Sequence, residues 1–213
     1  ARAYSKLSKF EEAIRWYKQL LEKEERTDAW YYLGCALSHK EKFDEALTAF
    51  HKVVGNGSHY DVLASLQCGH VFFRTGKIKE AEESYQRAYS IEPGNVDILY
   101  ALGFFYYDVG NDDKALNCLT EVIKSNPEHA HARFTLGLIH EKKGNVEQAI
   151  AGYEKALTDE TTSLKGHLRL GIMYCRKSEY EKAIQHLQKV YQSGDRSDTV
   201  LFYLGLAGSQ NGQ

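Results

Sequence analysis

The sequence repeats itself with a period of about 34 residues, and this period constrains the fold more than any other feature. In five of the periods a glycine precedes an alanine by twelve residues. Two registers that keep the same period indicate a repeat array, in which neighbouring units stack on one another. The glycines are Gly34, Gly69, Gly103, Gly137, Gly171 and Gly205, and the alanines are Ala13, Ala46, Ala81, Ala115, Ala149 and Ala183.

Each period has the pattern of two amphipathic helices joined by a tight turn. Apolar residues lie three or four positions apart on both sides of the turn, as in Leu99, Leu102 and Tyr106. Only two prolines occur in 213 residues, which favours a mostly helical chain because proline breaks helix interiors. The sequence therefore predicts antiparallel pairs of helices, here called helix A and helix B.

The pattern of large and small residues resembles the tetratricopeptide repeat (TPR) family over essentially the whole chain. The resemblance implies an all-α fold, a right-handed α-solenoid of antiparallel helix pairs. The chain departs from the family at one repeat position, where only the first complete repeat has the family's tryptophan, Trp30. The other repeats have Ser65, Leu99, Arg133, His167 and Leu201 there. In the first complete repeat the matching residues are Trp30, Leu33, Gly34, Leu37, Ala46 and Phe50.

The period predicts one solenoid domain that begins and ends inside a repeat. We expect each recurring glycine to let helix A approach helix B opposite the recurring alanine, because glycine has no side chain to hold the helices apart. The predicted units are a truncated repeat at 1–26 (the end of a helix A and a helix B), complete repeats at 27–61, 62–95, 96–129, 130–163 and 164–197, and a further helix A at 198–213.

The last predicted helix is apolar nearly all round, which is unlike the polar face that caps a solenoid. The chain also begins with Ala1 instead of Met. We therefore expect that it is part of a longer array, or that this helix packs on a second copy of the chain. The candidate self-association residues are Leu201, Phe202, Tyr203 and Leu206.

Composition and charge exclude several other classes of protein. With 27 Lys and Arg against 29 Asp and Glu, the net charge of −2 argues against a nucleic-acid partner. The longest apolar stretch, residues 98–107, is too short for membrane insertion. The four cysteines lie far apart in the sequence, so we expect free thiols and a reducing, cytoplasmic location.

No motif indicates catalysis, a cofactor or a metal site. The glycines between residues 69 and 77 lack the spacing of a phosphate-binding loop. His129 and His131 are two residues apart, which on a helix does not point both rings at one ion. We expect no enzymatic activity, no cofactor and no metal within these residues.

The resemblance implies that helix A lines the concave face, where family members bind partners. This face carries an aromatic set and, in the fifth repeat, a basic set, which together would hold an apolar segment and an acidic group. The alternatives stay open: the aromatic rings could be core, and the cations could be a solvated face. The candidate groove residues are Tyr31, His70, Phe73, Tyr100, Phe104, Tyr107 and Phe134, with Lys165, Arg169 and Arg176.

One known groove of the family, a clamp for chaperone C-termini, is disfavoured. Lys165 and Arg169 match its last two positions, but Tyr100, Phe104 and Thr135 do not match the earlier ones. The leading prediction is a non-enzymatic scaffold for other proteins, with self-assembly into a homo-oligomer through its ends as a further expectation. The alternatives are a substrate-recruiting arm of a larger enzyme such as a glycosyltransferase, an organelle-coating scaffold similar to magnetosome-associated TPR proteins, or a pilus-assembly TPR protein.

Overall fold

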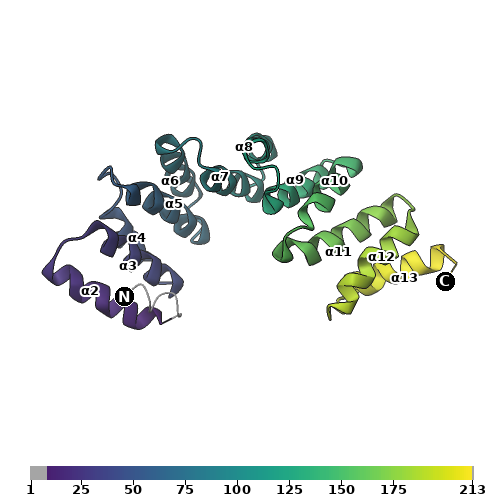
Figure 1. Ribbon diagram of the computed structural model, residues 1–213, viewed down its shortest axis with the longest axis horizontal. Helices are drawn as coiled ribbons and strands as arrows, with labels where there is room; N and C mark the ends of the chain where they lie inside the picture. Colours follow the sequence, from purple (N-terminus) through teal and green to yellow (C-terminus); the bar gives the residue numbers. More distant parts are fainter. Residues whose placement is uncertain (1–8, 213) are drawn as a thin grey trace. The chain divides into compact units, whose positions relative to one another are not determined.

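The computed structural model describes residues 9–212, which form twelve helices and no strand (Figure 1). The first eight residues of the predicted truncated repeat lie outside this range. The helices are α2 (Phe10–Lys23), α3 (Thr27–His39), α4 (Phe43–His51), α5 (His59–Arg74), α6 (Ile78–Ile91), α7 (Val96–Asp108), α8 (Asp112–Ser125), α9 (Ala130–Lys142), α10 (Val146–Ala156), α11 (Glu160–Arg176), α12 (Tyr180–Gln192) and α13 (Asp198–Gln210).

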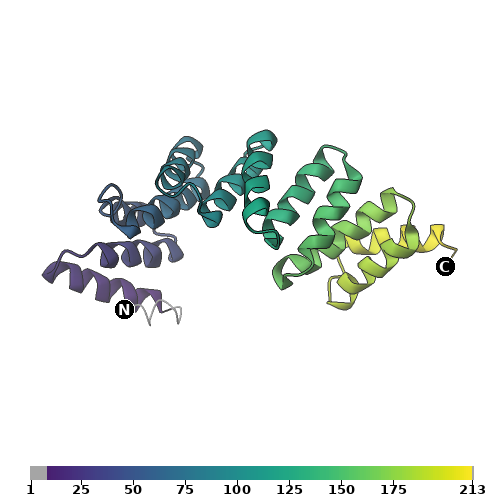
Figure 2. The ribbon, with the colours of Figure 1, turned by 45° about the horizontal axis from the view of Figure 1, so that its top comes forward.

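The chain divides into two compact units, unit 1 (residues 1–105) and unit 2 (residues 106–213), with the boundary inside α7. In unit 1, α3 packs on α4 and α5 packs on α6; in unit 2, α9 packs on α10 and α11 packs on α12. The members of each pair run antiparallel (Figure 2). The predicted all-α solenoid of helix pairs is thereby confirmed.

The turn inside each pair depends on one residue in the left-handed region of backbone space. Gly76 has φ +75°, a conformation that costs glycine little because it has no Cβ. Its amide donates back to the carbonyl of Phe73 at 3.0 Å, which closes the end of α5. Two other pairs use Glu41 (φ +58°) and Ser178 (φ +61°) at the equivalent position, so glycine is favoured there but not required.

The recurring glycines do bring the helices of a pair close together, but their nearest partner is not the one we expected. A Cβ placed on Gly34 would lie 2.5 Å from the ring of Phe50, four residues after Ala46. At Gly137 the backbone oxygen of Ala149 also lies 3.3 Å from the added Cβ, so the glycine approaches both the alanine and the large residue one turn later. Side chains on a helix lean toward its N-terminus, so the large residue one turn later covers the spot beside the alanine. The same arrangement joins Gly69 to Tyr85, Gly137 to Tyr153 and Gly171 to Leu187.

Helix α13 presents apolar side chains to solvent within the described residues. Leu201 is 47% exposed and Phe202 is 63% exposed, whereas Tyr203 and Leu206 are half-buried. No described atom lies within 4 Å of a Cβ placed on Gly205. Self-association through this helix stays a prediction. None of the helices in residues 9–212 combines the length and apolarity needed to cross a membrane.

Candidate protein-binding surfaces

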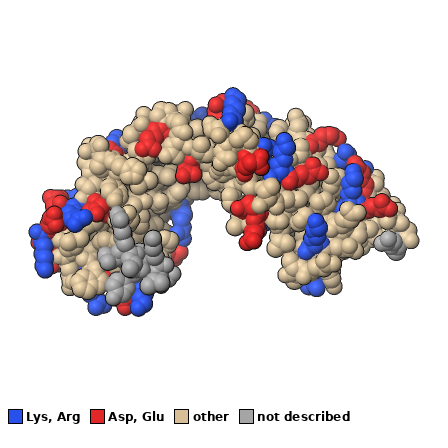
Figure 3. Space-filling view, viewed as in Figure 1, with Lys and Arg blue, Asp and Glu red and all other residues tan. Residues whose placement is uncertain are grey.

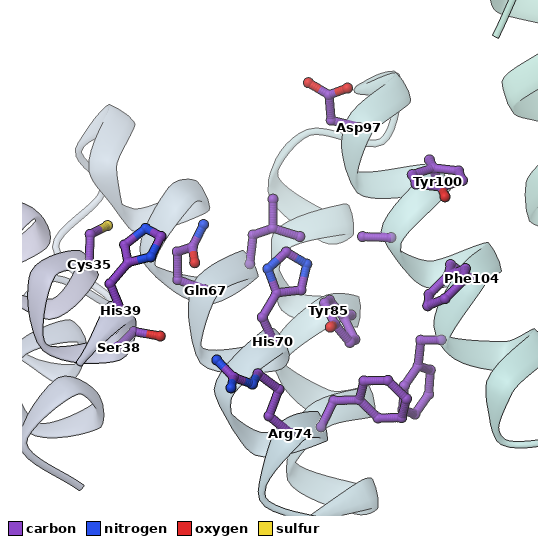
Figure 4. A pocket seen from close by; sticks show the side chains of 14 residues that line it. Cys35, Ser38, His39, Gln67, His70, Arg74, Tyr85, Asp97, Tyr100 and Phe104 are labelled. Carbon is purple, nitrogen blue, oxygen red and sulfur yellow. The ribbon is translucent and has the colours of Figure 1, made fainter. Parts of the chain in front are cut away.

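Unit 1 contains a cavity of about 560 Å³ between α3, α5 and α7, with one residue added by α6 (Figure 4). Residues three or four apart on one helix share a face. Helices α3, α5 and α7, each the helix A of its pair, therefore present a row of side chains to the same cavity. The cavity is lined by Cys35, Ser38, His39, Leu66, Gln67, His70, Phe73, Arg74, Tyr85, Asp97, Tyr100, Ala101, Phe104 and Phe105.

Aromatic rings form much of the cavity wall. Phe105 and Tyr85 are almost fully buried, and their ring centroids lie 5.4 Å apart. The rings of Phe73 and His70 contact them edge-on, with centroid distances of 5.5 Å to Phe105 and 5.4 Å to Tyr85 respectively. Phe104 is 40% exposed at the cavity. The wall is therefore supported from beneath by buried rings, while Phe104 and His70 remain exposed to a ligand.

The cavity lining also includes charged and titratable side chains. Figure 4 shows Asp97 and Arg74 toward opposite ends of the lining. The guanidinium of Arg74 donates to Glu41 Oε1 at 2.8 Å. Partial burial lowers the pKa of His70, so its imidazole is neutral at pH 7. Burial raises the pKa of Cys35 to about 11, against a hydrogen bond with Tyr31 that lowers it, so the thiol is protonated at pH 7.

Unit 2 contains a smaller cavity of about 340 Å³ with different chemistry. The Glu141 side chain is 11% exposed and accepts a hydrogen bond of 2.6 Å from the Tyr153 hydroxyl. Glu141 Oε1 also lies 3.5 Å from Arg169 Nη1 and 3.6 Å from Arg176 Nη1. The cavity is lined by Tyr107, Leu138, Glu141, Lys142, Arg169 and Arg176.

Seven of the ten predicted groove residues line one of these two cavities, and three do not. The first group comprises His70, Phe73, Tyr100 and Phe104 in unit 1, and Tyr107, Arg169 and Arg176 in unit 2. Tyr31 is half-buried against the core, with ring centroids 5.2 Å from Tyr32 and 5.3 Å from Tyr60. Phe134 packs on Tyr153 at 5.4 Å. Lys165 is exposed and lines neither cavity.

Sequence reasoning did not select several residues that shape the sites. Tyr85 and Phe105 occupy core positions of the repeat. A single sequence does not show which core rings also line a cavity. Glu141 lies on the predicted groove face, and its spacing of about one repeat from Arg176 was the available signal. No group of three or more His, Cys, Asp or Glu in residues 9–212 is arranged to hold a metal ion.

Charges of both signs are interspersed on the face of the molecule shown in Figure 3. Repeated pairs of antiparallel helices, with cavities lined mainly by helix A of each pair, are typical of helical-repeat proteins. The chain belongs to the tetratricopeptide repeat family: family profiles match residues 1–61, 72–133 and 130–158.

Relatives and solved structures agree with this assignment. BBSome complex member BBS4 of Bos taurus is 26% identical over 133 residues, which are 62% of this chain and 25% of that protein. The matched segment spans between 10% and 27% of the first three curated relatives. A chain of the APC/C hetero-tetramer Cut9-Hcn1 superposes with a TM-score of 0.74 at 19% identity, covering 96% of this chain and 40% of that one. PilF of Pseudomonas aeruginosa superposes with a TM-score of 0.76 at 22% identity, covering 86% and 83%. At these identities the structures show the fold alone.

Proposed function

We propose that the chain is a non-enzymatic scaffold for protein–protein interaction, and that unit 1 binds a partner segment through an apolar or aromatic side chain. The observation that carries the proposal is the cavity between α3, α5 and α7. Its volume of about 560 Å³ lies within the range of ligand pockets, roughly 300–1,000 Å³. Family membership supports the scaffold role, and the relatives named above include a BBSome complex member.

The chemistry of the wall selects the kind of side chain that enters. Buried Tyr85 and Phe105 fix the shape of the cavity, so a ligand does not have to order it on binding. An aromatic side chain can stack against Phe104 or contact its edge, which adds about 0.5–1.5 kcal/mol beyond the burial of area. Asp97 and Arg74 lie toward the two ends, where they can contact polar groups that flank the inserted residue.

The test is a quantitative pull-down from cell lysate with the wild-type chain and with the double variant Tyr100→Ala, Phe104→Ala. We expect the variant to lose the partners that the wild type enriches, because truncation of interface aromatics typically costs about 2 kcal/mol or more. The matched control is Tyr89→Ala, Tyr191→Ala, which removes two exposed rings outside the cavity. Equal recovery of partners by the wild type and the cavity variant would contradict the proposal.

A further inference from the structure

The unit 2 cavity contains two arginines that share one carboxylate. Arg169 and Arg176 are seven residues apart on α11, so they lie two turns apart on the same face of the helix. Within the described residues, Glu141 is the only ionic or hydrogen-bonding partner of either guanidinium. Both distances to Glu141 exceed the 2.7–2.9 Å that is typical of a well-formed charge-assisted hydrogen bond.

The arginines therefore keep most of their hydrogen-bonding capacity. A guanidinium carries five N–H donors, and the contact with Glu141 uses one nitrogen of each. The arginine side chains are 43% and 51% exposed, so the remaining donors can reach a ligand in the cavity.

Glu141 is held in place by a different neighbour. Its Oε2 atom accepts the hydrogen bond from the Tyr153 hydroxyl, whereas Oε1 faces the two guanidinium groups. One carboxylate between two like charges lowers their repulsion and keeps them close when the cavity holds no ligand. Lys142 does not change this account, because Asp112 Oδ2 lies 2.9 Å from its Nζ. The cavity thus retains an excess of one positive charge over its built-in carboxylate.

We propose that this cavity binds an anionic side chain of a partner protein, through a carboxylate or phosphate group held by Arg169 and Arg176. Both groups match the planar, forked geometry of guanidinium donors. Tyr107 and Leu138 supply apolar wall beside the arginines, and a volume of about 340 Å³ leaves room for one side chain. Lys165 lines neither cavity and is not part of the site. The site is independent of the aromatic cavity proposed for unit 1.

The experiment is an NMR titration of the whole 213-residue chain with three terminally blocked peptides of one sequence. The first peptide carries two adjacent glutamates, the second has glutamines in their place, and the third has phosphoserines. We expect the glutamate and phosphoserine peptides to shift the Nε–H signals of Arg169 and Arg176, and the glutamine peptide to leave them in place. The ratio of the two anionic affinities assigns the preferred group, carboxylate or phosphate.

The variant Arg169→Gln, Arg176→Gln should weaken binding of the anionic peptides by roughly tenfold or more, since both charged donors are removed. The control variant Lys124→Gln, Lys155→Gln removes the same charge from exposed positions of unit 2 and should bind as the wild type does. Equal shifts with the glutamate and glutamine peptides would overturn the proposal, and this comparison needs no variant. Equal weakening in the arginine and lysine variants would also overturn it, because binding would then follow net charge alone.

Discussion

The two cavities occupy related faces of the same repeat scaffold, yet one is aromatic and the other is charged. Phe73 in unit 1 and Glu141 in unit 2 are two periods apart, at equivalent repeat positions. The ring of Phe73 packs on Phe105 at 5.5 Å, whereas Glu141 accepts the Tyr153 hydroxyl and faces two arginines. At this repeat position, phenylalanine is thus found in the cavity with an apolar wall and glutamate in the cavity with an ionic wall. The side chains at such positions set the chemistry of each cavity, while the repeat pattern sets the helices beneath them.

The second contrast between the units lies under the cavities, in how closely the helices of a pair approach. Gly152 of α10 lies against the backbone of α9: a Cβ there would be 3.0 Å from the Arg133 oxygen and 3.0 Å from the Gly137 Cα. The equivalent residue of unit 1 is Ser84, two periods earlier, which already has a side chain. We infer that the α9–α10 pair needs glycine at this position whereas the α5–α6 pair does not.

The largest expected effect follows from this contrast. Gly152→Ala should lower the free energy of unfolding by about 2 kcal/mol, because two backbones must separate and the gain in helix propensity offsets only part of that cost. Urea denaturation followed by circular dichroism measures the change. The control is Gly205→Ala, where the added methyl meets no described atom within 4 Å and the helix gains about 0.5–1 kcal/mol. A loss in both variants would show that the effect belongs to helical glycine in general.

A somewhat smaller effect is expected from two tyrosines at equivalent positions. Tyr85 and Tyr153 each cover a glycine of the preceding helix, Gly69 and Gly137. Of these two hydroxyls, only that of Tyr153 donates to a carboxylate, Glu141, among the residues described. Tyr153→Phe should therefore cost about 1.5 kcal/mol, the usual value for a hydrogen bond to a charged group, and Tyr85→Phe close to none. The measurement is again urea denaturation. Equal losses in the two variants would remove the distinction between the units.

The repeat pattern predicted the helix pairs and the face that carries the cavities, because steric packing between helices recurs with the period. His70, Phe73, Tyr100 and Phe104 were selected from that face, and the structure brings all four to one cavity. The pattern could not separate Tyr31 from Tyr100, which occupy the same repeat position. Tyr31 is packed against Tyr60, so the difference depends on a neighbour that lies outside the repeat pattern.

The repeat pattern also could not predict the ion pairs of Glu141 with Arg169 and Arg176 in unit 2. The sequence predicts the arginines as a basic cluster for an acidic ligand, and it places Glu141 on the same predicted face. Whether a carboxylate neutralises such a cluster depends on side-chain reach across two helices, which the period does not encode. The structure places Glu141 near both arginines at 3.5–3.6 Å, so the cluster retains less positive charge than the sequence alone suggests.

A third contrast between the units concerns a pair of histidines. His167 Nδ1 and His186 Nδ1 lie 2.8 Å apart, and the ring of Tyr174 stacks on His186. The equivalent residues of unit 1 are Ser65 and Ser84. A hydrogen bond at this distance needs a proton on one Nδ1 and a free lone pair on the other, so protonation of both rings would place two donors face to face.

The smallest expected effect is the response of this pair to acid. Burial lowers the pKa of His186 to about 4, helped by the positive charges of His167 and Lys189 and opposed by Glu154. In the unfolded chain a histidine titrates near pH 6.5, so between about pH 6.5 and pH 4 the unfolded state binds more protons than the folded state. Stability should therefore fall as the pH decreases through this window, by about 1 kcal/mol because the ring is partly exposed and solvent screens it. Urea denaturation at several pH values measures the slope, and His186→Gln should flatten it. An identical slope in the wild type and the variant would assign the acid sensitivity to other groups and would leave the two units alike in this respect.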